Sequence, residues 1–383
     1  MFRERRIISF SEYVSISSNS LTAVLAQLLT QGSYFDSTLI ALSQWPPSAL
    51  PTLSIVQDPL DPGLAENRAF AQPLVFFRLD PFASLVCSPY LSSLTALRLR
   101  IPSRQITRFI TTHPLSIPSL QFLDLSTCNV LDAEVDALLT RFAKLRHLVL
   151  DGCAVLKGEL REGEWGALGK SCALAGVRRA KEREKKLKVW LEANGPVFSD
   201  HQAQTGLVQE VDAHAAAARK ARRGRRGLAT ATISLRPSPP RDGVPLPVLH
   251  IPIPKIRILP PSPSLQSLAT TTSTLIHPDK YPVVRAEFER GWADGLAQLG
   301  ATRARLRQSS MNGVRIVQFV DDVEQEGLDG LADVEMGNEE AFRVREDVWK
   351  VPVFCLVGAG RGEHHIEGCG HAVGWKIWKN ELE

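Results

Sequence analysis

The residues near the C-terminus that could do chemistry are two cysteines and three histidines: Cys355, His364, His365, Cys369 and His371. Thiolate sulfur and imidazole nitrogen are ligands that Zn²⁺ prefers, and about four of them arranged tetrahedrally make a structural site. The spacing H-H-x-x-x-C-x-H matches no standard zinc finger, however, and no C-x-x-C pair accompanies it. We therefore prefer a glycine-rich polar loop with ordinary histidines and expect no metal or cofactor, with a zinc-containing module as an alternative.

No other pattern in the sequence indicates an enzyme. Residues 358–362 read G-A-G-R-G after an apolar strand, but a histidine pair follows instead of a helix, which favours a simple turn. The chain contains neither the G-x-S-x-G elbow of a nucleophilic serine nor the G-x-x-x-x-G-K-[ST] loop that binds phosphate. We expect a non-catalytic protein.

A repeated leucine pattern predicts the strands and helices that would position any functional site. Residues 120–130 and 145–155 both fit L-x-x-L-x-L-x-x-C-x-V and are offset by 25 residues (145 − 120). Leucine-rich repeats have periods of roughly 20–29 residues. In L-x-L the two leucines point inward from a short parallel strand, and the residue between them points outward. The cysteine then lies where the strand ends, where it can hydrogen-bond the backbone of the neighbouring coil.

Weaker copies of the pattern lie upstream, at residues 94–99, 74–79 and 50–55. Between the repeats, residues 131–142 carry apolar side chains at helical spacing, and residues 106–110 suggest a shorter helix. These segments would return the chain from one strand to the next.

Residues 94–155 resemble leucine-rich repeats of the cysteine-containing, ribonuclease-inhibitor-like kind, which also occur in F-box substrate receptors. The resemblance implies an α/β fold, a leucine-rich-repeat solenoid with a curved parallel sheet, here irregular and interrupted by a charged helical insertion. It implies no ligand or activity. An F-box would open with a Leu-Pro pair before the repeats, whereas Leu50-Pro51 already lies in a repeat strand. A diverged substrate receptor of a ubiquitin ligase is therefore an alternative.

The sequence predicts three regions. Residues 1–156 form the leucine-rich-repeat segment, and residues 157–227 form a basic helical insertion that we expect to be partly disordered. Residues 228–383 contain a Pro-rich stretch and a C-terminal α/β segment, with a long amphipathic helix at 281–308 and strands at 314–320 and 351–357. The solenoid either resumes in this region, at residues 246–251, or gives way to a polyproline linker.

The outward residues of the predicted strands form the candidate binding surface. The concave sheet of a solenoid commonly binds partners, so we predict a protein partner and a scaffold function. The candidate residues are Arg78, Arg98, Arg100, Phe122, Asp124, His147 and Asp151.

Charge and composition narrow the possible partners and the compartment. The net charge of +4 over 383 residues does not by itself indicate nucleic acid. Two basic tracts, 178–188 and 219–226, leave RNA binding or nuclear import open, against a solvated helix for the first and a neutral tail for the second. No stretch approaches the roughly 20 apolar residues that span a bilayer. Six scattered cysteines indicate free thiols in a reducing compartment, so we expect an intracellular protein of the cytoplasm or nucleus. The oligomeric state is not indicated.

Overall fold

The computed structural model describes twelve stretches of the chain: 35–47, 50–56, 79–101, 104–111, 117–153, 164–194, 255–271, 276–320, 327–335, 338–344, 349–358 and 365–378. The chain divides into two compact units, one made of Met1–Val189 together with Lys255–Glu383 and the other of Trp190–Pro254. Only residues 190–194 of the second unit are described, so the fold given below is that of the first unit.

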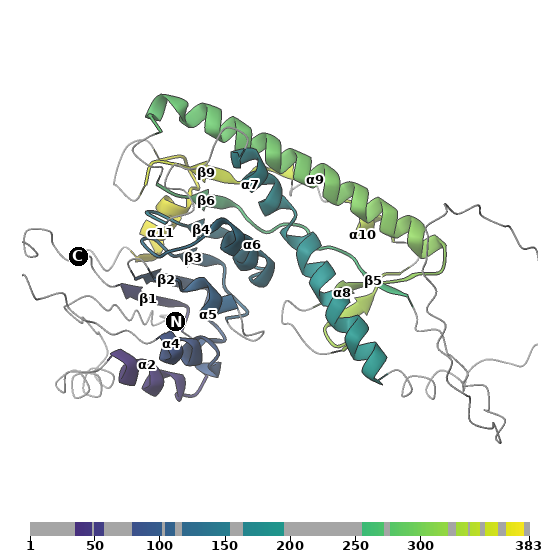
Figure 1. Ribbon diagram of the computed structural model, residues 1–383, viewed down its shortest axis with the longest axis horizontal. Helices are drawn as coiled ribbons and strands as arrows, with labels where there is room; N and C mark the ends of the chain where they lie inside the picture. The colour runs from purple at the N-terminus through teal and green to yellow at the C-terminus, as the bar shows by residue number, and fades with distance from the viewer. Residues whose placement is uncertain are drawn as a thin grey trace, which may run out of the picture. The chain divides into compact units, whose positions relative to one another are not determined.

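The first unit is built on a six-stranded sheet with the order β1-β2-β3-β4-β6-β9 (Figure 1). Every neighbouring pair of strands in it is parallel. The strands are β1 (Thr52–Val56), β2 (Ala96–Arg100), β3 (Phe122–Asp124), β4 (His147–Val149), β6 (Ser267–Ala269) and β9 (Val353–Cys355). The predicted α/β class with a parallel sheet is therefore confirmed.

The register of this sheet aligns one large apolar side chain from every strand. The aligned residues are Leu53, Leu97, Leu123, Leu148, Leu268 and Phe354, and each is at most 3 % exposed. The next residue of each strand faces the opposite side, which we call the outer face. That outer column consists of Ser54, Arg98, Asp124, Val149, Ala269 and Cys355. The L-x-L pattern thus predicted which side chains point inward in the first four strands.

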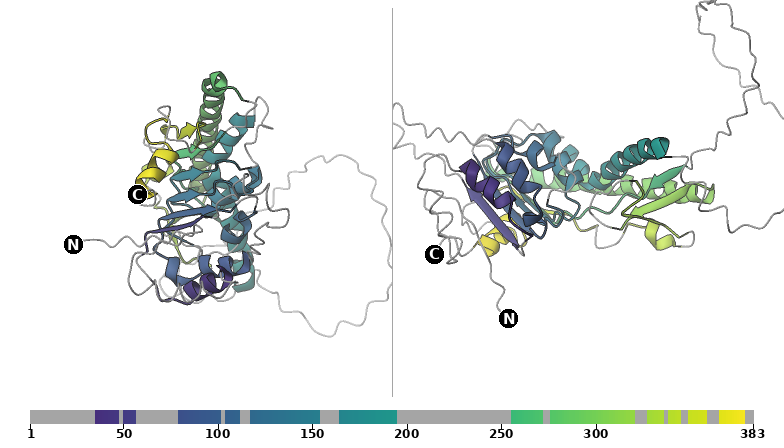
Figure 2. Two further views of the ribbon diagram at one scale, coloured as in Figure 1. Left: turned by 90° about the vertical axis from the view of Figure 1, so that its left-hand side faces the viewer. Right: turned by 90° about the horizontal axis from the view of Figure 1, so that it is seen from below.

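Helices cover the inner face of the sheet and share one apolar core with the leucine column. They are α2 (Phe35–Ser43), α4 (Leu79–Val86), the 3-10 turn η1 (Pro89–Leu91), α5 (Thr107–Thr111), α6 (Asp132–Arg141), α7 (Glu164–Ala173) and α9 (Tyr281–Met311). The helices predicted at 106–110, 131–142 and 281–308 are confirmed as α5, α6 and α9. Figure 2 shows the helices on one side of the sheet and the yellow C-terminal helix on the other.

Buried polar side chains close the turns after three strands. The Cys128 thiol donates to the carbonyl of Leu99 at 3.3 Å, and the Cys153 thiol donates to Leu125 at 3.2 Å. After β6, the hydroxyl of Thr270 makes a similar bond and donates to the carbonyl of Leu150 at 3.1 Å. Each bond satisfies a carbonyl of the preceding coil, as the position of the cysteine in the sequence pattern predicted.

Helices α7 and α9 cross so closely that glycine is required where they meet. A Cβ atom added to Gly291 would lie 1.8 Å from the carbonyl oxygen of Gly166. A Cβ on Gly169 would lie 2.2 Å from the carbonyl oxygen of Phe288. Since real Cβ atoms do not approach a backbone oxygen this closely, the crossing depends on these glycines.

A second, three-stranded sheet has the order β5-β7-β8. Strand β5 is parallel to β7, and β7 is antiparallel to β8. The remaining elements are β5 (Ile256–Ile258), β7 (Arg315–Phe319), β8 (Leu331–Asp333), α8 (Ala175–Asn194), α10 (Glu339–Phe342) and the 3-10 turn η4 (Pro278–Lys280). The basic tract 178–188 lies within α8, and its Arg183 is buried and donates to the carbonyl oxygens of Gly327 and Asp329.

The prediction of a repeat strand at residues 74–79 is wrong at its end, because Leu79 begins helix α4. Strand β1 pairs directly with β2, so no strand from this segment lies between them. Arg78, the binding candidate of that repeat, lies outside the described residues.

The main sheet continues beyond β4, through β6 and β9. The segment in which we expected it to resume, residues 246–251, lies outside the described residues, as does the basic tract 219–226. Within the part of the chain that the structure describes, no helix is long and apolar enough to cross a bilayer.

Candidate metal centre

The last helix, α11 (Gly370–Trp378), packs on the outer face of the sheet. Two glycines let it approach closely, since a Cβ on Gly370 would lie 3.0 Å from Val149 and one on Gly374 would lie 3.0 Å from Phe122. At its end, Trp378 is 2 % exposed and lies 4.5 Å from the guanidinium of Arg98, a cation–π distance. Helix α11 therefore covers the apolar part of the outer face.

This packing changes the surface that the sequence predicted for a protein partner. Phe122, Asp124 and Asp151 were expected to face solvent, but they are 2 %, 3 % and 6 % exposed. Helix α11 contacts Phe122 through Gly374 and Asp151 through His371, so the chain's own helix occupies part of this face. A sequence pattern shows that a residue points outward from its strand, but it does not show what lies above that strand.

Four of the predicted binding residues, Arg98, Arg100, Asp124 and His147, make polar contacts with neighbouring side chains or backbone. Asp124 accepts a hydrogen bond from Arg100 at 2.8 Å, lies 3.6 Å from Arg98 and accepts from the backbone N–H of Ser126. His147 is half-buried, its Nδ1 lies 2.8 Å from the Ser267 hydroxyl, and burial lowers its pKa. Arg98 and Arg100 remain partly exposed beside α11, with side-chain exposures of 13 % and 30 %.

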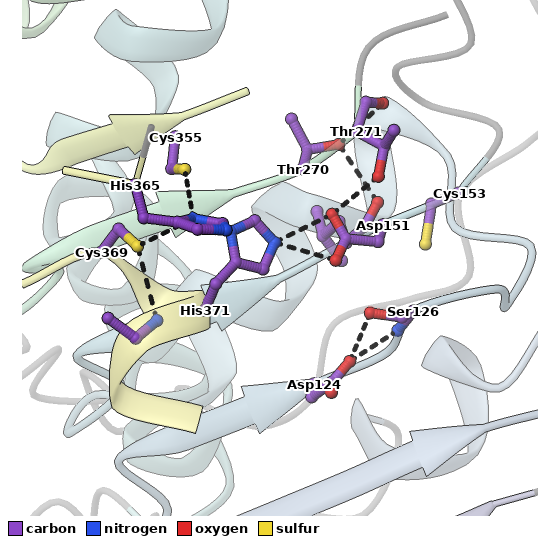
Figure 3. Close-up of polar contacts among 12 residues, drawn as sticks. Asp124, Ser126, Asp151, Cys153, Thr270, Thr271, Cys355, His365, Cys369 and His371 are labelled. Atoms are coloured by element: carbon purple, nitrogen blue, oxygen red, sulfur yellow. Dashed lines mark hydrogen bonds and ion pairs between the residues drawn. The ribbon is translucent and has the colours of Figure 1, made fainter. Parts of the chain in front are cut away.

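Four cysteine and histidine side chains converge where α11 begins (Figure 3). Cys355 ends strand β9, His365 and Cys369 belong to the turn before α11, and His371 lies in its first turn. One potential ligand atom from each residue lies within 4.8 Å of all the others. His364, the fifth sequence candidate, lies outside the described residues.

The distances within this cluster fit a tetrahedral zinc site. Nδ1 of His365 lies 3.6 Å from the Cys355 sulfur and 3.6 Å from the Cys369 sulfur. Zinc bonds of about 2.3 Å to sulfur and about 2.0–2.1 Å to nitrogen, at the tetrahedral angle, place the two ligand atoms about 3.5 Å apart. The His365 ring is also held edge-on to Trp375, with ring centroids 4.7 Å apart.

His371 is oriented as a metal ligand by a buried carboxylate. Its Nε2 lies 2.8 Å and 3.0 Å from the two carboxylate oxygens of Asp151, which also accepts a hydrogen bond from Thr271 at 2.9 Å. Its Nδ1 is buried and makes no hydrogen bond within the described residues. Metal-binding histidines commonly donate one ring N–H to a carboxylate, which leaves the other nitrogen for the metal.

The close contacts in the cluster shift the pKa values of His371, Cys355 and Cys369. Burial lowers the pKa of His371, but the Asp151 carboxylate that its Nε2 contacts and the nearby Cys369 sulfur outweigh it and raise the pKa to about 9. The hydrogen bond from the Cys355 thiol lowers the pKa of Cys369, helped by His371 and by the backbone N–H of Ala372, while the pKa of Cys355 is raised. These contacts favour negative charge on the Cys369 sulfur.

The geometry reverses the preference for an ordinary polar loop that we took from the sequence. The spacing matched no zinc finger because the ligands come from a strand, a turn and a helix, with Asp151 contributed by the turn after β4. Asp151 itself was identified in the sequence, but as a partner-binding residue. Comparison of the chain with protein families, curated proteins and solved structures gave no match.

Proposed function

We propose that the protein is a non-catalytic scaffold in which Cys355, His365, Cys369 and His371 bind one zinc ion. The observation that carries the proposal is the convergence of four soft or borderline ligand atoms within 4.8 Å. The ion would join the end of β9 to the start of α11 and so fasten that helix to the outer face.

The ligand set favours a structural role over a catalytic one. Structural zinc sites use four protein ligands, whereas catalytic sites use three and keep one position open for water or substrate. Here two cysteines and two histidines supply all four, and Cys355, Cys369 and His371 are at most 5 % exposed. A metal in this cluster would therefore organise the fold and would have no free position at which to activate a substrate.

The scaffold part of the proposal rests on the repeated architecture of the sheet. Parallel strands in register present a regular outer surface, and helix α11 already packs on it. A partner would bind beside α11, where Arg98 and Arg100 are partly exposed. The leucine-rich-repeat resemblance points to the same role, because repeat proteins of this kind commonly bind other proteins.

Metal analysis of the purified full-length chain tests the zinc proposal. We expect about one zinc per chain by inductively coupled plasma mass spectrometry, because four protein ligands complete one site. The double variant Cys369→Ser/His371→Ala removes half of the ligands, and its zinc content should be close to zero. Cys87→Ser, a cysteine outside the cluster, serves as the matched control and should keep the wild-type content. Wild-type protein that remains metal-free after refolding with zinc would contradict the proposal.

Asp151→Asn is expected to weaken zinc binding by roughly 10- to 100-fold, because carboxylates that orient a metal-binding histidine contribute on this scale. The amide keeps the size of the side chain but removes the charge that faces His371 Nε2. Competition with a chromophoric chelator measures the change in affinity. Asp136→Asn is the matched control, since Asp136 pairs with Arg178 outside the cluster and its change should leave zinc affinity unaltered.

A further inference from the structure

The six cysteines of the chain differ sharply in what surrounds their sulfur atoms. Cys128 and Cys153 donate to backbone carbonyls in the turns of the sheet. Burial raises the pKa of both Cys128 and Cys172 to about 12, and it also raises that of Cys87. Since the thiolate is the form that reacts with oxidants, burial makes Cys87, Cys128 and Cys172 poorly reactive.

Cys355 and Cys369 differ from the other cysteines because their sulfur atoms lie close to each other and to a histidine. Their sulfur atoms lie within 4.8 Å of each other, and each lies 3.6 Å from His365 Nδ1. The backbone N–H of Ala372 also donates to the Cys369 sulfur at 3.4 Å, which favours negative charge there. His365 is only half-buried, so this side of the cluster reaches solvent.

The chain next to Cys369 has room to adjust. Gly368 adopts a positive φ of 77°, and among the described residues no atom lies within 4 Å of the position of an added Cβ. A disulfide has an S–S length of about 2.05 Å, so the two sulfur atoms would need to approach by less than about 3 Å. Because Gly368 has no Cβ and tolerates a positive φ, the turn before α11 can supply a shift of this size.

From this arrangement we infer that the zinc site is exchangeable with a disulfide, so that a hydroperoxide converts the zinc-bound pair Cys355 and Cys369 into a Cys355–Cys369 disulfide and releases the zinc ion. The inference rests on the proposed zinc function, and it adds that oxidants regulate whether zinc is bound. The disulfide joins the same two elements, β9 and the start of α11, so the helix stays attached to the sheet in both states.

The exchange balances in atoms and electrons. The Cys369 sulfur attacks one oxygen of hydrogen peroxide, the O–O bond breaks, and a sulfenic acid and hydroxide form. The Cys355 sulfur then attacks the Cys369 sulfur, the S–O bond breaks and a second hydroxide leaves. Two protons from solvent convert both hydroxides to water. Peroxide gains the two electrons that the two sulfur atoms lose. The zinc ion is released because only the two histidine ligands remain, and a structural zinc site needs about four.

Treatment of the zinc-loaded full-length protein with hydrogen peroxide tests the inference. We expect release of about one zinc per chain, followed with a chromophoric chelator, together with one disulfide that peptide mass spectrometry assigns to Cys355 and Cys369. A thiol reductant should restore zinc binding. Cys87→Ser should behave as wild type, because Cys87 is a half-exposed thiol outside the cluster.

Two results would overturn the inference while leaving the zinc proposal intact. One is zinc that stays bound at peroxide concentrations that already oxidise Cys87. The other is zinc release with the two sulfurs present as sulfinic acids and no disulfide between them. Protein that carries no zinc before peroxide is added would instead refute the proposed function, and this inference with it.

Discussion

Chelation of the proposed zinc ion, without oxidation, is expected to loosen helix α11 from the outer face of the sheet. Structural zinc contributes about 10–16 kcal/mol of apparent binding energy in zinc-finger peptides, and here that energy would act at the start of α11. Without the metal, α11 keeps its packing of Gly374 on Phe122 and of Trp378 under Arg98. We expect amide exchange in α11 to accelerate at least about 100-fold, equivalent to about 2.7 kcal/mol of local opening.

Hydrogen exchange read out by mass spectrometry resolves this effect by segment. Helix α6 packs on the inner face, away from the cluster, and its exchange rate should stay the same after chelation. The peroxide-treated protein provides a second comparison, because a disulfide should preserve the protection of α11 although the zinc is gone. If α11 exchanged at the same rate with and without metal, zinc would not be what fastens this helix.

Gly291→Ala is expected to destabilise the protein by about 3 kcal/mol or more, the upper part of the range for overpacking a well-packed interior. The added methyl group would lie 1.8 Å from the carbonyl oxygen of Gly166, a backbone atom that cannot rotate away. Helices α7 and α9 would have to separate, and both bury side chains in the main core: Trp165 and Leu168 from α7, and Phe288 and Trp292 from α9. A lower midpoint of urea unfolding measures the loss.

Gly300→Ala is the matched control for this prediction, since it makes the same change in the same helix. Among the described residues, the nearest atom to a Cβ on Gly300 is in the Val344 side chain at 3.9 Å, which is an ordinary contact. Alanine favours the helix over glycine by about 1 kcal/mol, so this variant should be as stable as wild type or slightly more stable. Equal stability of the Gly291 and Gly300 variants would show that the close crossing of α7 and α9 does not limit stability.

The local pattern of the sequence predicted the inner half of the sheet well. The L-x-L motif identified Leu97, Leu123 and Leu148 as inward residues, and the following cysteines form the predicted bonds to neighbouring coils. Helices α6 and α9 followed from the spacing of their apolar residues. In each case neighbouring residues of one element carry the signal, because the period of a strand or helix fixes which side chains share a face.

The pattern gave less information where the repeats become irregular. Strand β6 keeps Leu268 in the inward column but carries Thr270 where a second leucine would stand. Residues 74–79 fit the pattern, yet Leu79 starts a helix. A short apolar motif fits more than one secondary structure, and packing against the rest of the chain decides between them.

The sequence by itself determined the inward residues of the first four strands, helices α5, α6 and α9, and the presence of zinc-type ligands near the C-terminus. Only the tertiary structure decided that these ligands meet and that α11 lies on the outer face. His371 and its partner Asp151 are 220 residues apart, and the strands of the second sheet lie between them in the sequence. Periodicity reports which way a side chain points from its own element. Which other strand that side chain meets depends on the order of the strands in the sheet. That order is determined by the packing of the whole unit.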